Sequence, residues 1–219
     1  MSHQVAVIGM GRFGISLACE LYRIGHDVLA VDRYETLTQQ MMGLVTYSVT
    51  GDSTSMQFLD EVGIRNFDTA VVAIGDIQAS VLTTVLLKRT FEVPEVVARA
   101  TNELHGKTLE AVGSDRVIYP EQETGLRTAH SLFQREVLEY MELNDTFGLS
   151  KVSVTTKMVG LTLEKAGLST ISSDVTGTTI IAINRGSIPI LSPSKDEVIQ
   201  TGDELILAGP EDTLEKFGN

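Results

Sequence analysis

A glycine-rich segment near the amino terminus constrains this chain more than any other feature. It directly follows the apolar run Gln4–Ile8, which predicts a β-strand, and precedes an amphipathic stretch to about Ile24, which predicts a helix. Gly9 permits a tight turn, Gly11 lets the main chain approach a phosphate, and Gly14 lets the helix pack closely on the strand. The free amides and positive end of such a helix attract anions. We therefore expect a nucleotide's phosphates to bind at Gly9, Met10, Gly11, Arg12, Phe13 and Gly14, the alternative being a glycine turn kept only for packing.

Short apolar runs alternate with amphipathic stretches up to about residue 120. Strands are predicted at Gln4–Ile8, Val28–Asp32, Thr46–Thr50, Thr69–Ile74, Glu95–Arg99 and Arg116–Tyr119. The intervening helices are predicted at Tyr34–Met42, from an N-cap at Ser53 through Val62, at Ile77–Phe91 and at Asn102–Val112. Nearly continuous apolar strands are expected when helices cover both faces of a parallel sheet. The repeat predicts an α/β fold, a Rossmann-type doubly wound parallel sheet spanning residues 1–121.

The pattern changes after Pro120. Gln122–Tyr140 carries apolar residues every three or four positions and predicts a helix, which could cross to a partner, dock a lobe or simply end the domain. We assign 122–142 to this crossover helix and 143–219 to a small α+β C-terminal lobe. Its strands are predicted at Leu149–Thr156, Thr179–Asn184, Ile188–Leu191 and Glu204–Gly209, with turns at Arg185-Gly186 and Gly202-Asp203.

Polar residues that follow the predicted strands indicate the rest of a nucleotide site. Asp32 lies 18 residues beyond Gly14, where a carboxylate accepts hydrogen bonds from ribose hydroxyls and repels a 2′-phosphate. Arg33 could stack on adenine or face solvent. The remaining candidates are Gly51, Asp52 and Ser53, beside the adenine or its ribose, and Ala73, Ile74, Gly75 and Asp76, near the phosphates. For Asp52 and Asp76 the alternative is helix capping.

Arg12 places a permanent cation inside the glycine loop. A guanidinium there favours a ligand with extra terminal charge, such as ADP or ATP, over a dinucleotide. The alternative is a surface arginine that points into solvent.

Composition excludes several functional classes. The net charge is −12, from 17 basic and 29 acidic residues, which disfavours binding to nucleic acid and to anionic lipid. The single cysteine, Cys19, allows no internal disulfide. No signal peptide and no apolar stretch of about 20 residues is seen, so we expect a cytoplasmic protein.

No catalytic machinery is evident in the sequence. None of the histidines has a plausible acid–base partner nearby, and the phosphate-binding GxxxxGK[ST] motif is missing. The histidines are His3, His26, His105 and His130. A nucleotide site without chemistry beside it indicates sensing, so we expect a protein that is not an enzyme.

Several segments resemble one known family over essentially the whole chain. They are Val5–Gly14, Gly63–Asp68, Val72–Gly75, Ile77–Ser80, Leu82–Thr84, Asp115–Glu121 and Thr201–Gly209. The chain is similar to the RCK (KTN/TrkA) regulatory subunits of the Ktr and Trk potassium uptake systems, and the Ktr branch fits better. The sequence keeps two alternatives open, an NAD-dependent oxidoreductase and an NAD(H)-sensing TrkA-type subunit.

The resemblance implies a gating subunit of a potassium transporter. Such subunits dimerise through the helix after strand six, form octameric rings and dock on a potassium-translocating membrane subunit of the KtrB or TrkH type. Their N-lobe binds ATP and ADP, or NAD(H) in the Trk branch, and the ligand changes the ring's shape.

The resemblance also implies roles for particular residues. Arg12 would reach the terminal phosphate and Glu121 a divalent cation, Mg or Ca; a helix N-terminal carboxylate is the alternative for Glu121. Arg99 would line the same cleft or form a surface ion pair, and Gln78 belongs to the site through the segment Ile77–Ser80. Some relatives bind cyclic di-AMP in the C-lobe, but Leu168–Thr176 lacks the basic residue expected for its phosphates.

Overall fold

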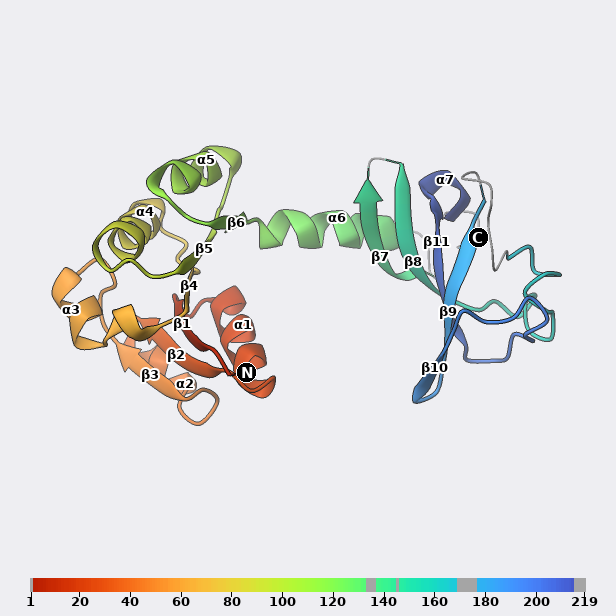
Figure 1. The fold of residues 1–219 in the computed structure, drawn as a ribbon, viewed down its shortest axis with the longest axis horizontal. Coiled ribbons are helices and arrows are strands. Elements are labelled where there is room, and N and C mark those ends of the chain that lie inside the picture. The colour runs from red at the N-terminus through yellow and green to blue at the C-terminus, as the bar shows by residue number, and fades with distance from the viewer. Residues whose placement is uncertain (1, 133–136, 145, 169–176, 215–219) are drawn as a thin grey trace. The chain divides into compact units, whose positions relative to one another are not determined.

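A computed structural model describes residues 2–132, 137–144, 146–168 and 177–214. The chain divides into two compact units, Met1–Gln122 and Glu123–Asn219. Figure 1 labels their helices and strands.

The first unit is built on a six-stranded parallel sheet. Its strands are β1 (Gln4–Ile8), β2 (Asp27–Asp32), β3 (Tyr47–Thr50), β4 (Thr69–Val72), β5 (Glu95–Arg99) and β6 (Arg116–Ile118). They lie in the order β3-β2-β1-β4-β5-β6. The chain therefore reverses its direction of winding between β1 and β4, and ligands of such sheets bind at the carboxyl ends of the strands beside that point. The predicted Rossmann-type sheet is confirmed.

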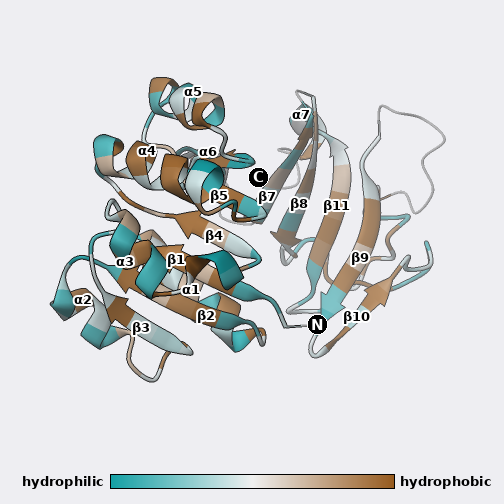
Figure 2. Ribbon diagram, turned by 60° about the vertical axis from the view of Figure 1, so that its left-hand side comes forward, coloured by the Kyte–Doolittle hydropathy of each residue, from teal (hydrophilic) through white to brown (hydrophobic). Residues whose placement is uncertain are grey.

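Helices cover both faces of this sheet because alternate strand residues point to opposite sides. They are α1 (Arg12–Arg23), α2 (Glu35–Gln40), α3 (Met56–Glu61), α4 (Ile77–Val85) and α5 (Glu103–Val112). Val5 and Val7 pack with α1 and α2, whereas Ala6 and Ile8 pack with α3, α4 and α5. Figure 2 shows the central strands mostly in the hydrophobic colour and a mixture of hydrophobic and hydrophilic residues on the helices.

Two local expectations for the first unit are wrong. Ser55, not Ser53, is the N-cap of α3, because its hydroxyl accepts the N–H of Phe58 at 3.3 Å. The hydroxyl of Ser53 is instead buried and lies 2.9 Å from that of Thr83. The helix predicted at Ile77–Phe91 is α-helical only to Val85, and Leu86–Thr90 continues it as one π-helical segment.

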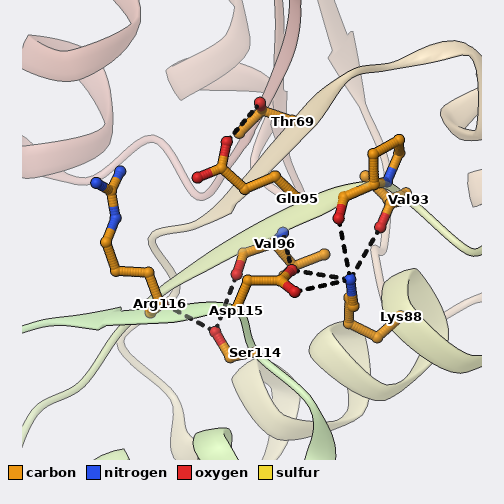
Figure 3. A network of polar contacts seen from close by, with 9 residues as sticks. Thr69, Lys88, Val93, Glu95, Val96, Ser114, Asp115 and Arg116 are labelled. Carbon is orange, nitrogen blue, oxygen red and sulfur yellow. Dashed lines mark hydrogen bonds and ion pairs between the residues drawn. The ribbon is translucent and has the colours of Figure 1, made fainter.

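A polar network joins the amino ends of β5 and β6, at the sheet edge away from the carboxyl ends (Figure 3). Lys88 Nζ donates to the carbonyls of Val93 and Pro94 and forms an ion pair with Asp115 at 2.8 Å. Asp115 in turn accepts the N–H of Val96 at 2.7 Å. The network ties the π-helical segment that carries Lys88 to the start of both strands.

The second unit contains a five-stranded antiparallel sheet in the order β10-β9-β11-β8-β7. Its strands are β7 (Val137–Asn144), β8 (Phe147–Ser153), β9 (Thr179–Arg185), β10 (Ile188–Leu191) and β11 (Glu204–Pro210). The helices are α6 (Pro120–Leu132), which begins in the first unit, and α7 (Glu211–Leu214). Alternate residues of β8 and β11 are buried, so one face of the sheet forms the core with Leu163, Leu168 and Ile199.

The helix predicted over Gln122–Tyr140 is too long. It ends at Leu132, and Val137–Tyr140 belong to β7, which pairs with β8. Tyr140 also fits a strand, since it packs against the core of the second unit. The predicted hairpin is confirmed: β9 and β10 pair across Gly186, whose φ is +67°.

Candidate nucleotide-binding site

A cavity of about 310 Å³ opens at the carboxyl ends of β1, β2, β3 and β4. The predicted residues that line it are Gly9, Gly11, Asp32, Arg33, Gly51, Asp52, Ser53, Ala73, Ile74, Gly75, Asp76 and Arg99. These residues come from five strand ends of one sheet, so the alternation of strands and helices brings them together. The cavity lies where doubly wound sheets bind nucleotides.

Each of the three glycines of the first turn lacks a side chain for a different structural reason. A Cβ on Gly9, whose φ is +102°, would lie 2.9 Å from the backbone of Ala73. A Cβ on Gly14 would lie inside contact distance of the Gly9 carbonyl oxygen, so this glycine permits close packing of α1. A Cβ on Gly11 would meet no atom within 4 Å, and Gly11 itself lines the cavity. The open side of Gly11 is therefore where a phosphate can approach the main chain.

Asp32 is held in position by the backbone around it. Its Oδ2 accepts the N–H of Met10 at 2.7 Å and its Oδ1 accepts the N–H of Tyr34 at 2.9 Å. A carboxylate has about four acceptor positions, so two remain for ribose hydroxyls. The side chain of Met10 is fully buried. Met10 therefore acts on the site through the N–H that it donates to Asp32.

Beside Asp32, a second carboxylate is fixed by its own turn. Asp52 Oδ1 accepts the N–H and the hydroxyl of Thr54, at 2.9 and 2.7 Å. These hydrogen bonds, and then the charge of Arg33, hold the pKa of Asp52 below its ordinary value. Arg33 lies 4.7 Å above the ring of Tyr34. The part of the cavity that follows β2 and β3 thus carries two carboxylates and one cation.

Asp76 caps a helix and also lines the cavity. Its Oδ1 accepts the N–H of Ala79 at 2.8 Å and so caps α4, and the residue also lines the cavity. Asp52 caps no helix, because the N-cap of α3 is Ser55.

Arg99 and Glu121 form an ion pair beside the cavity. Arg99 Nε donates to Glu121 Oε2 at 3.3 Å, and Nη2 donates to Oε1. The pairing with Arg99, and more weakly the charge of Arg12, lowers the pKa of Glu121 although partial burial opposes the shift. Arg12 is exposed on the first turn of α1. The surface ion pair considered for Arg99 is therefore present, and Arg99 lines the cavity as well.

The structure separates the other predicted residues from the cavity wall. Met10 and Gly14 are buried, and Arg12, Gln78 and Glu121 are exposed. Phe13 is half-buried and does not line the cavity either. Prediction missed the lining residues Ile8, Val31, Tyr34, Leu37 and Ala79. Ile8 and Val31 could have been found, because they lie at or next to the carboxyl ends of their strands.

His105 lies near this site but is engaged with the backbone. Its ring is buried, and Nδ1 accepts the N–H of Thr101 at 3.2 Å. The side chain of His130 is outside the described residues. In the part of the chain that the structure describes, no three His, Cys, Asp or Glu side chains gather as a metal site, and no helix is long and apolar enough to span a membrane.

Comparison with known proteins extends this picture to both units. A TrkA-N domain model matches residues 5–120, and a TrkA-C domain model matches residues 149–219. This chain belongs to the RCK (KTN/TrkA) family. The family membership expected from the sequence is thereby confirmed.

Relatives of this RCK chain include two Ktr proteins of similar length. The Ktr system potassium uptake protein A of Bacillus subtilis is 38% identical over 99% of this chain and 96% of its own length. The protein of the same name from Vibrio alginolyticus is 31% identical, over 96% and 94%.

Solved structures support the fold of the RCK chain. The RCK domain of GsuK superposes with a TM-score of 0.56 at 24% identity, over 98% of this chain and 45% of that one. A structure of GsuK bound to ADP matches 61% of this chain and 35% of the other, with a TM-score of 0.52 at 25% identity. The chain thus spans less than half the length of these GsuK chains.

Proposed function

We propose that this RCK chain is the regulatory subunit of a Ktr-type potassium uptake system, and that it binds ATP and ADP to control potassium flux. The main support for this proposal is the cavity at the point where the sheet reverses its winding. In that cavity Gly11 is open to a phosphate, and the position of Asp32 suits a ribose. The match to Ktr system proteins along nearly their whole length supports the potassium uptake role. The protein senses its ligand and performs no chemistry on it.

Adenine nucleotides suit the charge distribution of the cavity. Asp32 and Asp52 lie at the ribose end and disfavour a 2′-phosphate, whereas Arg99 and the amino end of α1 attract phosphates. A ligand controls the protein only by binding one conformation more tightly than another. The phosphates provide such a preference, since ATP and ADP differ by one charged group at the cationic end.

A divalent cation, Mg or Ca, belongs to the same proposal. Glu121 pairs with Arg99 and lies within the field of Arg12, and its carboxylate would supply one oxygen ligand. One carboxylate fits Mg²⁺ where substrate phosphates and water complete the shell. Glu121 would then hold the ion beside the phosphates, and the ion would neutralise part of their charge.

Helix α6 supports the proposal that the protein dimerises and assembles into an octameric ring. Every side chain of α6 from Glu121 to Ala129 is exposed in the single chain. An isolated helix of 13 residues is marginally stable in water, so α6 needs a cover. A second copy of the chain provides it, and a potassium-translocating subunit of the KtrB or TrkH type anchors the ring at the cytoplasmic face of the membrane.

The identity of the ligand is tested by mass spectrometry of the small molecules released from purified, denatured protein. We expect ADP or ATP, and calorimetric titration should then give tighter binding of ATP and ADP than of NAD. Release of NAD(H) alone, with no affinity for ATP or ADP at millimolar concentration, would contradict the proposal. Co-purification with a potassium-translocating membrane protein tests the proposed role in potassium uptake.

Arg12→Ala tests the charge argument in the same titrations. We expect the substitution to weaken ATP binding by about tenfold and NAD binding by much less, because a charge-assisted phosphate contact is worth about 1.5–3 kcal/mol. Arg23→Ala, at the far end of α1, is the matched control. An equal loss for both ligands would reject this role of Arg12.

A further inference from the structure

Arg99 is held by a carboxylate that does not belong to the cavity wall. The Arg99 side chain is 20% exposed and lines the cavity. The Glu121 side chain is 65% exposed on the first turn of α6. Nε and Nη2 of the guanidinium donate to the two oxygens of Glu121. This two-point contact occupies Nε and Nη2, one of the two edges at which a guanidinium binds a phosphate in a bidentate manner.

The cavity has few other positive charges to offer a phosphate. Its lining includes two basic residues, Arg33 and Arg99. Arg33 lies over Tyr34 and within the field of Asp52, at the ribose end. Of the basic side chains that line the cavity, Arg99 is therefore the one left for the phosphates, alongside the amino end of α1 and Arg12 outside the cavity wall. The Arg99 guanidinium cannot serve Glu121 and a phosphate with the same nitrogen atoms.

We propose that Glu121 competes with the ligand's phosphates for Arg99, so that binding of a nucleoside diphosphate or triphosphate breaks the Arg99–Glu121 pair and frees the first turn of α6. This inference rests on the nucleotide-binding function proposed above. Helix α6 continues from this turn to Leu132 in the second unit. Exchange of the partner of Arg99 thus gives the cavity a direct means to act on the helix, and only ligands that carry phosphates can use it.

The test is calorimetric titration of the full chain with ADP and with adenosine, in a chelator that removes divalent cations. Glu121→Gln keeps the shape of the side chain and removes the competing charge. We expect it to bind ADP about two- to fivefold more tightly than the wild type, since exposed ion pairs are worth about 0.2–1 kcal/mol. Adenosine has no phosphate and should bind both proteins equally.

A double-mutant cycle separates competition from simple repulsion between Glu121 and the phosphates. Arg99→Gln should weaken ADP but not adenosine, and adding Glu121→Gln to it should give no further gain, because no guanidinium remains to be freed. Glu123→Gln removes the same charge from the same helix, outside the pair, and should leave ADP affinity unchanged.

Two results would overturn the competition. ADP affinity of Glu121→Gln equal to or below that of the wild type would show that the carboxylate does not hold Arg99 back. A gain that persists in the Arg99→Gln background would assign the effect to repulsion alone. Absence of binding of both ADP and adenosine to the wild type is a distinct outcome, since it rejects the nucleotide-binding function on which the inference rests.

Discussion

The side chain of Asp32 is fixed by the backbone of two turns. Both of its oxygens accept backbone N–H groups, from Met10 and Tyr34, so its orientation is fixed by the two turns that frame the cavity. A group fixed in this way loses little conformational freedom on binding, which raises affinity without new contacts. The same hydrogen bonds tie the glycine turn to the end of β2.

His105 gives the folding stability of the first unit a dependence on pH. Burial, and then the charge of Arg99, lowers the pKa of His105 below its ordinary value. The folded protein therefore favours the neutral ring, whose Nδ1 accepts the N–H of Thr101. Its contribution to stability is fully present above the pKa of an unfolded-state histidine, about 6.5, and is lost as the pH falls toward the lowered value.

We expect the wild type to lose unfolding free energy between pH 7.5 and pH 5.5 relative to His105→Gln. Glutamine keeps an acceptor for Thr101 and does not titrate, so the comparison isolates the histidine. The measurement is urea denaturation followed by circular dichroism at several pH values. Parallel curves for His105→Gln and the wild type would contradict the prediction.

For single residues, the sequence predicts where a residue lies in the fold better than which residue it contacts. The residues that follow the strands, such as Gly51 and Gly75, could be placed because parallel strands end at one sheet edge. The pairing of Arg99 with Glu121 was open, because two segments 22 residues apart meet only once β5 and β6 are paired. Ser53 was misassigned as a cap because Ser55 is an equally good acceptor two residues later.

Among the elements, the strands of the first unit were the most predictable. Buried parallel strands appear as short apolar runs between turns, and all six lie within two residues of their predicted bounds. The helix over Gln122–Tyr140 was predicted too long, since spacings of three or four do not exclude a strand over a few residues. The pairing of β7 with β8 makes residues 137–140 a strand, and contacts between strands cannot be predicted from local periodicity.

The turn before β11 depends on one ionic cluster. Arg185 donates to both oxygens of Asp203 at 2.8 Å, to Glu197 at 2.8 Å and to the carbonyl of Val198. Asp203 is 1% exposed, and it also accepts the N–H of Gln200. The cluster ties the end of β9 to the segment that precedes β11.

Asp203→Ala should destabilise the second unit by about 3 kcal/mol, because it leaves a partly buried guanidinium and a backbone N–H without their acceptor. Urea denaturation at pH 7 measures the loss, and the change should be confined to the transition of the second unit if the two units unfold separately. Asp196→Ala, on an exposed loop position, should change stability by less than about 0.5 kcal/mol. A similar small effect at Asp203 would show that the cluster is not stabilising.

The whole molecule combines an acidic surface with an uncovered helix. A net charge of −12 keeps a monomer soluble and opposes nonspecific association of copies. The exposed side chains of α6 nevertheless include Leu126 and Leu132, at 50% and 63% exposure. Specific burial of this helix must then overcome the repulsion between like-charged chains, which predicts assembly that strengthens as salt screens the charges.

Leu126→Glu tests that balance directly. A glutamate on the apolar side of α6 would be buried against a second copy, at the cost of its desolvation and of added repulsion, so we expect assemblies to dissociate into monomers. Light scattering after size-exclusion chromatography measures the mass, with 23.8 kDa as the mass of one chain. Leu104→Glu is the matched control, because Leu104 is 76% exposed on a different helix, α5. Unchanged mass for Leu126→Glu, or a monomeric wild type at any salt concentration, would mean that something other than a second copy covers α6.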